Sequence, residues 1–323
     1  RRDVTAVSEQ RSGRQRIMVV GGAGFIGSHL TDRLLAEGRQ VDVVDDLSTG
    51  SLGNLAAARA VASTSGGDLK IHHLDAGSPE FVALVAMREP DVVVHLAPLP
   101  PGRTGTGVLA AAVQTTLNAI EAIRRVGPGK IVVAVPAVDL YGDVPSREQP
   151  IKDGRTFAPA GLRGVIARSV VELLESARAD DEVEFTALAV GSVYGSRQRA
   201  DGGVVAAFAT ALARGEAPTI EGDGRQSRDF VFVDDAVDAL VRATQRGSGL
   251  VMNVGTGIAT PVRELLAMLG GPSAPSPRHV PARRDDVARL ALAPTRARIH
   301  LSWAPWTDLA TGLRTVRASN TEG

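Results

Sequence analysis

Several residue types and patterns are missing from this 323-residue chain. It contains no cysteine, which excludes disulfides, thiol catalysis and cysteine-ligated metal sites. Its six histidines show none of the spacings that metal sites use, so we expect no bound metal. The chain has no apolar run long enough to cross a bilayer. Acidic and basic residues balance at 36 each, which gives no indication of a nucleic-acid partner or a charged membrane partner.

Lysine and tyrosine are also scarce, and this bears on chemistry. The lysines are Lys70, Lys130 and Lys152, and the tyrosines are Tyr141 and Tyr194. Proline and glutamine stand four residues after the two tyrosines. The sequence therefore excludes any tyrosine followed four residues later by a lysine.

What the chain does contain is an alternation of strands and helices typical of an α/β protein. Hydrophobic residues make up 44% of the sequence, enough for a large core. We expect residues 1–15 to form a mobile leader, because they are polar and aperiodic. Apolar strands are predicted at Arg16–Val20, Val41–Val44, Leu69–Leu74, Asp91–Leu96, Lys130–Val135 and Glu184–Val190. Helices are predicted at Phe25–Glu37, Val108–Val126, Arg163–Ala179, Val204–Gly215 and Val262–Leu269.

Continuous apolar strands between helices favour a doubly wound, parallel, Rossmann-like sheet covered on both faces. We therefore predict a dinucleotide-binding domain over residues 16–190. Beyond it the pattern loosens, which indicates a smaller C-terminal substrate domain over residues 191–323, with some interleaved segments. A cytoplasmic enzyme is the default expectation for such a chain.

A glycine-rich motif joins the first strand to the first helix. The run GGAGFIGSHL places Gly21, Gly24 and Gly27 between them. These glycines allow a tight turn, close approach of a pyrophosphate and close packing of helix on strand. The second strand ends at Asp45, whose carboxylate can accept the ribose hydroxyls of NAD, while Asp46 adds repulsion against a 2′-phosphate. The motif predicts NAD(P)H binding with NADH favoured and NADPH left open.

Further motifs make the chain resemble the extended short-chain dehydrogenases, the group of nucleotide-sugar epimerases and dehydratases. These motifs are VDDLSTG, HLA, VYGSR, GDGRQSRDFVFVDD and NVGTG, and the resemblance runs from Gln15 to about Val316. It implies a small-molecule substrate and a homodimer through the two long helices. It also implies cofactor contacts from Phe25, Ile26, Asp75, Ala76, Leu96, Ala97, Pro98, Val135, Arg168, Val190 and Val193.

The chain differs from this family at the three positions that carry the family's catalytic residues. The family uses a Ser or Thr, a Tyr and a Lys, and the corresponding positions hold Ala137, Gly164 and Arg168. Arg168 keeps a charge that could hold the ribose, but it has no tyrosine to activate. The resemblance places the substrate pocket at Leu99, Pro100, Pro101, Ala137, Tyr141, Ser192, Tyr194 and Arg228. We expect Tyr141 to be a wall residue.

Three functions remain open from the sequence. The first is an NAD(P)H-dependent ketoreductase of an aromatic polyketide, because a phenol beside the ketone could replace the missing tyrosine. This loss of residues resembles the atypical ketoreductases of angucyclinone antibiotic pathways, such as that of simocyclinone biosynthesis. The second is a nucleotide-sugar epimerase or dehydratase with displaced catalytic residues. The third is a non-catalytic dinucleotide-binding protein. Under the first hypothesis, alanine at Gly164 or lysine at Arg168 should change little.

Overall fold

The computed structural model describes residues 14–65, 68–99, 105–127, 129–159, 161–180, 183–272, 274–282 and 286–321. The predicted leader therefore lies almost wholly outside the described residues. Among the described helices, none combines the length and the apolar character needed to cross a bilayer.

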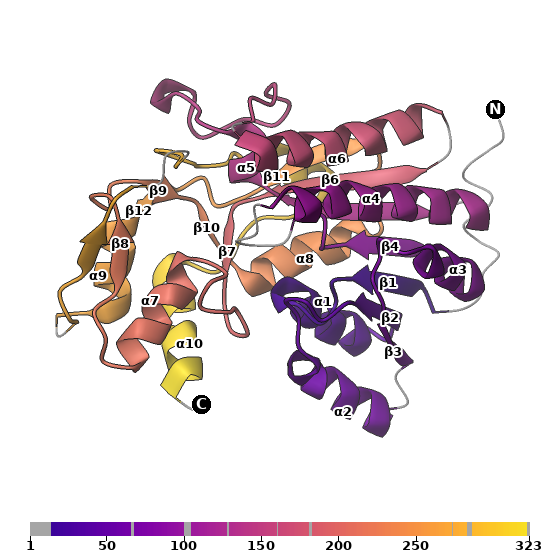
Figure 1. Cartoon of the computed structure of the whole chain (residues 1–323), viewed down its shortest axis with the longest axis horizontal. Coiled ribbons are helices and arrows are strands. Elements are labelled where there is room, and N and C mark those ends of the chain that lie inside the picture. Colours follow the sequence, from indigo (N-terminus) through magenta and orange to yellow (C-terminus); the bar gives the residue numbers. More distant parts are fainter. Residues whose placement is uncertain are drawn as a thin grey trace.

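A seven-stranded parallel sheet forms the centre of the molecule (Figure 1). Its spatial order is β11-β6-β5-β4-β1-β2-β3. The strands are β1 (Arg16–Val20), β2 (Gln40–Asp45), β3 (Leu69–His73), β4 (Val92–His95), β5 (Lys130–Pro136), β6 (Glu184–Val190) and β11 (Leu250–Val254). Both faces of the sheet are covered, which explains why the central strands read as unbroken apolar runs. The predicted fold class is confirmed.

Helices cover the sheet in two layers, each with its own hydrophobic core. One layer contains α1 (Phe25–Ala36), α2 (Ala56–Ser65) and α8 (Val233–Ala243). The other contains α3 (Pro79–Arg88), α4 (Thr106–Val126) and α6 (Gly161–Ala179), with the short α5 (Ala137–Tyr141) beside it. Because α8 and β11 come after residue 190 in the chain, the C-terminal half contributes to both the sheet and its covering layer.

The rest of the C-terminal half lies beyond the carboxyl end of the large sheet (Figure 1). It contains α7 (Val204–Ala213), α9 (Val262–Gly270) and α10 (Leu309–Thr321). Three strand pairs accompany them: β7 (Ser192–Tyr194) with β10 (Phe230–Phe232), β8 (Thr219–Glu221) with β13 (Arg278–Val280), and β9 (Ser227–Arg228) with β12 (Thr260–Pro261). Short helical turns at Leu52–Leu55, Ser146–Glu148 and Ala297–Leu301 complete the described elements.

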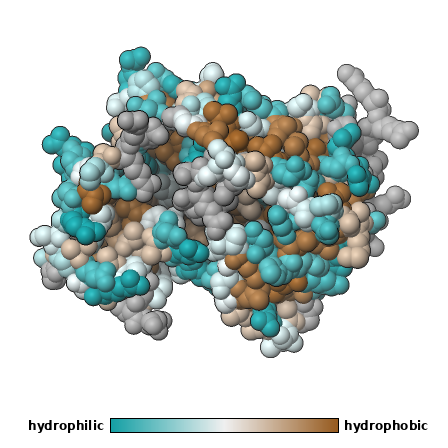
Figure 2. All heavy atoms as spheres, viewed as in Figure 1, coloured by the Kyte–Doolittle hydropathy of each residue, from teal (hydrophilic) through white to brown (hydrophobic). Residues whose placement is uncertain are grey.

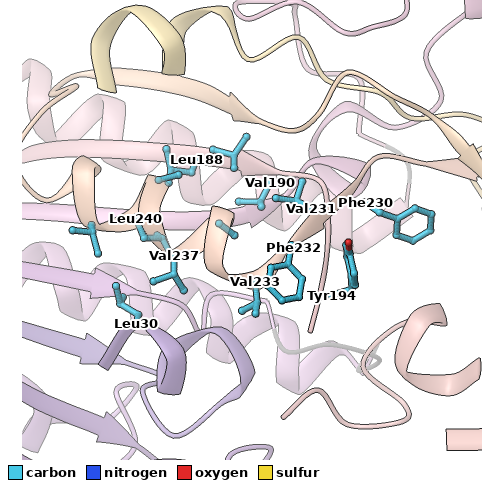
Figure 3. Packing of buried hydrophobic residues seen from close by; sticks show 14 of the residues in the cluster. Leu30, Leu188, Val190, Tyr194, Phe230, Val231, Phe232, Val233, Val237 and Leu240 are labelled. Carbon is cyan, nitrogen blue, oxygen red and sulfur yellow. The ribbon is translucent and has the colours of Figure 1, made fainter. Parts of the chain in front are cut away.

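Aromatic packing joins the C-terminal half to the sheet. The ring of Tyr194 lies 5.6 Å from that of Phe232 and 6.3 Å from that of Phe230, measured between centroids (Figure 3). Helix α10 closes over the same tyrosine at Gly312, where an added Cβ would lie 2.1 Å from the tyrosine hydroxyl. The positions of β7 and β10, which border the site described below, are therefore set by a rigid core.

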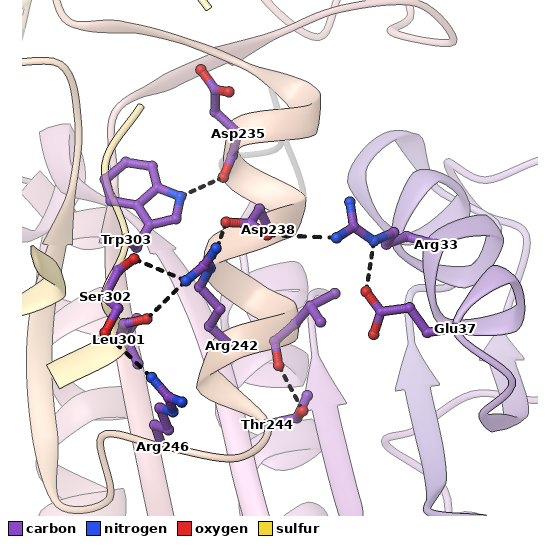
Figure 4. A network of polar contacts seen from close by, with 11 residues as sticks. Arg33, Glu37, Asp235, Asp238, Arg242, Thr244, Arg246, Leu301, Ser302 and Trp303 are labelled. Atoms are coloured by element: carbon purple, nitrogen blue, oxygen red, sulfur yellow. Dashed lines mark hydrogen bonds and ion pairs between the residues drawn. The ribbon is translucent and has the colours of Figure 1, made fainter. Parts of the chain in front are cut away.

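A polar network ties the C-terminal segment to α8 (Figure 4). The Trp303 indole N–H donates to the backbone carbonyl of Asp235 at 2.8 Å. The Arg242 side chain donates to Asp238 at 2.6 Å and to the carbonyl of Ser302 at 2.8 Å. Asp238 also lies 3.7 Å from Arg33 of α1, so the network reaches the helix that follows the glycine motif.

Candidate cofactor and substrate cavity

A cavity of about 500 Å³ crosses the carboxyl ends of the central strands. This is where open α/β sheets bind their ligands, because the loops after the strands leave a crevice there. The glycine motif and the ends of β2 and β3 line one half of the cavity. The ends of β4, β5 and β6 line the other half, together with β7, β10 and the start of α7.

The glycine motif forms a backbone cradle in the first half. Gly21 has a φ of +79°, which favours glycine. A Cβ at Gly27 would lie 2.1 Å from the carbonyl oxygen of Gly21, so only glycine fits there. Helix α1 begins at Phe25 without a side-chain cap or an acid in its first turn, which leaves its N–H groups free for an anion. These features fit the pyrophosphate of a dinucleotide.

The carboxylate of Asp45 lies at the end of β2, next to this cradle. The backbone N–H groups of Ala23 and Leu47 donate to its two oxygens at 2.9 and 2.8 Å. Burial raises the pKa of Asp45, and these two hydrogen bonds oppose that rise by favouring the charged form. The side chain is only 7% exposed, so it is held in one orientation. Its remaining lone pairs can accept the hydroxyls of a ribose.

The second half of the cavity is mainly apolar, although Arg197, Gln198 and Arg199 also line it, and the two arginines form ion pairs with Asp32 and Asp201. Its described lining includes Leu96, Ala97, Pro98, Leu99, Ala134, Val135, Pro136, Val138, Val190, Val193, Phe230 and Leu290. The hydroxyl of Thr115 borders the cavity, but it donates to the carbonyl of Ala112 at 2.9 Å and lies 3.1 Å from His95 Nε2. Burial lowers the pKa of His95 to about 4, so this imidazole is neutral at physiological pH. Of the two hydroxyls among the described side chains of this half, that of Thr115 is hydrogen-bonded, and that of Ser192 makes no hydrogen bond to the described residues.

Most of the site residues expected from the sequence lie in this lining. For the cofactor these are Gly21, Gly24, Phe25, Ile26, Gly27, Asp45, Asp46, Asp75, Ala76, Leu96, Ala97, Pro98, Val135, Val190 and Val193. For the substrate they are Leu99 and Ser192. Pro100 and Pro101 lie outside the described residues. The structure does not bring Ala137, Tyr141, Arg168, Tyr194 or Arg228 to the cavity.

Neither tyrosine is placed as a proton donor. The Tyr141 hydroxyl donates to Asn253 Oδ1 at 2.7 Å, and its ring is fully buried. The Tyr194 hydroxyl lies 3.5 Å from the carbonyl of Leu309 under α10. Burial raises the pKa of both phenols further above their usual value. The expectation that Tyr141 forms a wall of the substrate pocket is therefore corrected, because its side chain is turned toward β11.

The family positions on α6 also differ from expectation. The Arg168 side chain is 48% exposed and pairs with Glu172 at 2.6 Å, one helical turn away, so it faces outward and not toward a ribose. An added Cβ at Gly164 would lie 2.6 Å from the carbonyl oxygen of Asp139 and 2.7 Å from Pro159 Cβ. The backbone of α6 thus packs directly on α5. The expectation that alanine at Gly164 changes little conflicts with this contact.

Arg228 is held by its own neighbours. Its guanidinium donates to the carbonyls of Ser227 at 2.9 Å and Val287 at 2.6 Å. It also forms an ion pair with Asp286. These partners engage the guanidinium, and Arg228 is not among the described lining residues.

Sequence reasoning missed several residues of the lining. Ala112 and Thr115 come from α4, and a helix directly after β4 was a usable signal for them. Arg197 is the last residue of the motif VYGSR and Gln198 follows it directly, so the motif was a usable signal for both. Leu290 reaches the site from a loop that no sequence pattern marks. Among the described residues, no cluster of three or more potential ligands could hold a metal ion.

The comparisons with known proteins agree with this geometry. The NAD dependent epimerase/dehydratase family matches residues 17–255, which is more than half of the chain. The chain belongs to this family. A UDP-glucose 4-epimerase of Mycolicibacterium smegmatis is 36% identical over 316 residues, covering 92% of this chain and 96% of the relative. A putative UDP-glucose 4-epimerase of Methanocaldococcus jannaschii is 30% identical, covering 93% of this chain and 96% of the relative.

Solved structures show the same similarity in three dimensions. The UDP-glucose 4-epimerase of Thermotoga maritima with UDP-glucose has a TM-score of 0.85 and 30% identity, covering 94% of this chain and 98% of that one. The Thermus thermophilus UDP-glucose 4-epimerase complex with NAD has a TM-score of 0.84 and 29% identity, covering 95% and 99%.

Family membership confirms two predictions and weakens one. It confirms the extended short-chain dehydrogenase resemblance and the nicotinamide dinucleotide as cofactor. Nucleotide-sugar relatives favour the epimerase or dehydratase alternative over the ketoreductase of an aromatic polyketide, which no comparison supports.

Proposed function

We propose that this chain is an NADH-dependent reductase of a ketone whose own neighbouring hydroxyl supplies the proton. The observation that carries the proposal is the apolar half of the cavity. Its described lining offers no tyrosine, lysine, histidine or carboxylate beside the strand ends where a nicotinamide would lie. Bound NADH supplies the hydride, and the chain contributes binding, orientation and exclusion of water.

A substrate phenol is a chemical match for the missing tyrosine. Both have a pKa of about 10, and a positioned general acid is worth roughly 10²–10⁴-fold in rate. Leu99, Phe230 and Leu290 give the pocket walls that suit an aromatic ring system. We therefore keep the hydroxy-ketone of an aromatic polyketide as the proposed substrate.

The cofactor preference and the assembly belong to the same proposal. Asp45 is held by two backbone bonds, and Asp46 lies next to it, so a 2′-phosphate would meet two carboxylates. We propose NADH over NADPH on this ground. A homodimer through α4 and α6 also remains a prediction. These helices pack side by side, and Leu117, Leu162 and Val165 are 40–50% exposed on them. Hydrophobic residues gather at the upper surface of the molecule, where these helices lie in Figure 1 (Figure 2).

A second candidate is a nucleotide-sugar epimerase or dehydratase. The 36% identity to an epimerase over nearly the full chain favours it. It requires a base beside the sugar hydroxyl that is oxidised, and no described lining residue of the second half provides one. A non-catalytic dinucleotide-binding protein would need no such group at all.

The test is NADH and NADPH consumption with two substrate sets side by side. One set contains nucleotide sugars with a 4-keto group, and the other contains hydroxy-anthraquinone and angucyclinone ketones. We expect NADH consumption with the aromatic ketones alone, and none after the neighbouring phenol is methylated. Turnover of the nucleotide sugars, or normal turnover of the methylated ketone, would refute the proposal. Cofactor binding without turnover of either set would favour the non-catalytic alternative.

A further inference from the structure

We propose that Ser192 donates a hydrogen bond to the carbonyl oxygen of the ketone and stabilises the alkoxide that develops there. This assignment rests on the proposed function, which leaves the oxygen of the ketone without a protein partner. Ser192 borders the cavity between Gly191 and Val193, at the end of β6 and the start of β7. Its hydroxyl makes no hydrogen bond to any described residue, so it is available to a ligand.

The backbone around Ser192 is held rigidly. Its N–H donates to the carbonyl of Asp229 at 2.7 Å. A Cβ at Gly191 would lie 2.7 Å from that same carbonyl oxygen, so the chain approaches Asp229 as closely as glycine allows. On its other side, the N–H of Gly191 donates to the carbonyl of Val254 at 2.9 Å. The start of β7 is therefore pinned between β10 and β11.

Asp229 is itself immobilised. The carboxylate accepts backbone N–H groups of Thr256 at 2.8 Å, Gly257 at 2.9 Å and Leu292 at 2.9 Å. The Thr256 hydroxyl donates to it at 2.6 Å. Because this buried carboxylate is anchored to two separate loops, the carbonyl that holds Ser192 cannot follow a ligand. A donor fixed in this way requires no reorganisation when charge develops on the substrate oxygen.

The surroundings of Ser192 strengthen the hydrogen bond that its hydroxyl would make to a ligand. Val190, Val193 and Phe230 line the cavity around it, and this apolar wall lowers the local dielectric. A polar atom in such a wall also selects ligands, because a substrate that cannot accept its hydrogen bond leaves it unpaired. The position favours a ligand that presents a hydrogen-bond acceptor, such as a carbonyl oxygen, to Ser192.

The reaction balances with Ser192 keeping its own proton. The carbonyl carbon gains a hydride from NADH, and the C=O double bond becomes a C–O single bond. The oxygen gains the proton of the neighbouring substrate phenol, which leaves as phenolate and is protonated again by water after release. Ser192 holds the oxygen through this change and neither gains nor loses a proton.

The decisive experiment compares Ser192→Ala with Ser192→Thr, which restores a hydroxyl. We expect Ser192→Ala to lower kcat with a hydroxy-anthraquinone ketone by about 10²-fold with little change in KM, since the bond strengthens only as charge develops. Ser192→Thr should recover most of this loss. The shape of the pH profile should stay the same, because Ser192 is not the proton donor. Ser169→Ala on the exposed face of α6 is the matched control and should equal the wild type.

A second readout needs no turnover. A ketone labelled with ¹³C at the carbonyl is bound to the NAD⁺ complex, and its resonance is compared between the wild type and Ser192→Ala. We expect a downfield shift on binding to the wild type that is largely lost in the variant. Equal turnover by the wild type and Ser192→Ala would overturn the assignment of Ser192 and leave the proposed function intact. A carbonyl resonance that binding to the wild type does not move would overturn the assignment whatever the turnover assay gives.

Discussion

We predict that the buried imidazole of His95 makes the stability of the protein sensitive to mild acid. His95 is the last residue of β4 and is only 1% exposed. Among the described residues, its one hydrogen-bond partner is Thr115. Its Nδ1 has no partner there. A protonated ring would bury a charge and two N–H donors beside a single acceptor, which is why burial lowers its pKa from 6.5 to about 4.

The magnitude follows from this shift. As the pH falls below 6.5, the unfolded chain binds a proton at this site while the folded chain does not. The free energy of unfolding therefore decreases until the pH reaches about 4, where the folded form also binds the proton. A shift of roughly 2.5 units at 1.36 kcal/mol per unit predicts a total loss of about 3 kcal/mol. Above pH 6.5 the site contributes no pH dependence.

Urea unfolding of the wild type and His95→Gln between pH 4 and 7 tests this prediction. Glutamine can still reach Thr115 but does not titrate in this range. The wild type should lose about 3 kcal/mol relative to the variant across the interval. Subtracting the variant removes the contributions of Asp45, Asp229 and other buried acids. His300→Gln, on the surface, is the matched control. A difference between wild type and His95→Gln that does not change with pH would refute the reasoning.

Three further predictions concern packing and capping. Gly27→Ala should weaken NADH binding at least tenfold, because the added Cβ would collide with the carbonyl oxygen of Gly21. Fluorescence titration measures this affinity, and an unchanged value would contradict the proposed role of the glycine motif in holding the pyrophosphate. Gly164→Ala should lower the free energy of unfolding by about 1–3 kcal/mol in urea, because its Cβ meets the carbonyl of Asp139, and exposed Gly105→Ala is its control. Lys130→Met should lower the free energy of unfolding by about 2–4 kcal/mol in the same assay, because two carbonyls at the end of α8 lose the ammonium group that donates to each of them at 2.6 Å. A loss below about 1 kcal/mol would contradict this, since it would mean that water replaces the lysine as donor.

The cofactor half of the site was predictable because its information is local. The strand, the glycines and the first helix are contiguous, and Asp45 follows at the end of the next strand. Each residue there acts through its own backbone conformation or through neighbours close in sequence. Helices α2 and α3 escaped prediction even though Pro79 at the first turn of α3 is a recognised start signal.

The substrate half was less predictable because its walls come from distant segments. Tyr141 stands in a motif that resembles the family, yet its hydroxyl is taken by Asn253, 112 residues further along the chain. Leu290 joins the cavity through a loop whose position depends on the hydrogen bond between its N–H and the carbonyl of Ser227. The position of Arg168, by contrast, could have been predicted from the sequence. Glu172 follows it by one helical turn, and that spacing predicts an ion pair on the outer face of the helix.

The two halves of the cavity also differ in how easily their chemistry can change. On the proposed site, backbone groups and the carboxylate of Asp45 would hold the dinucleotide, so we expect binding to tolerate wide changes in the surrounding side chains. Proton transfer in the family depends on side chains of α6, and in this chain α6 packs at Gly164 against the backbone of α5. An epimerase must remove and return a hydroxyl proton in every cycle, so it needs a resident base. Reduction of a ketone takes up a single proton, which the substrate can carry in with it. On the proposed function, the dinucleotide cradle and the hydroxyl of Ser192 would be enough for reduction, whereas epimerisation would require a base that the described lining of the second half does not contain.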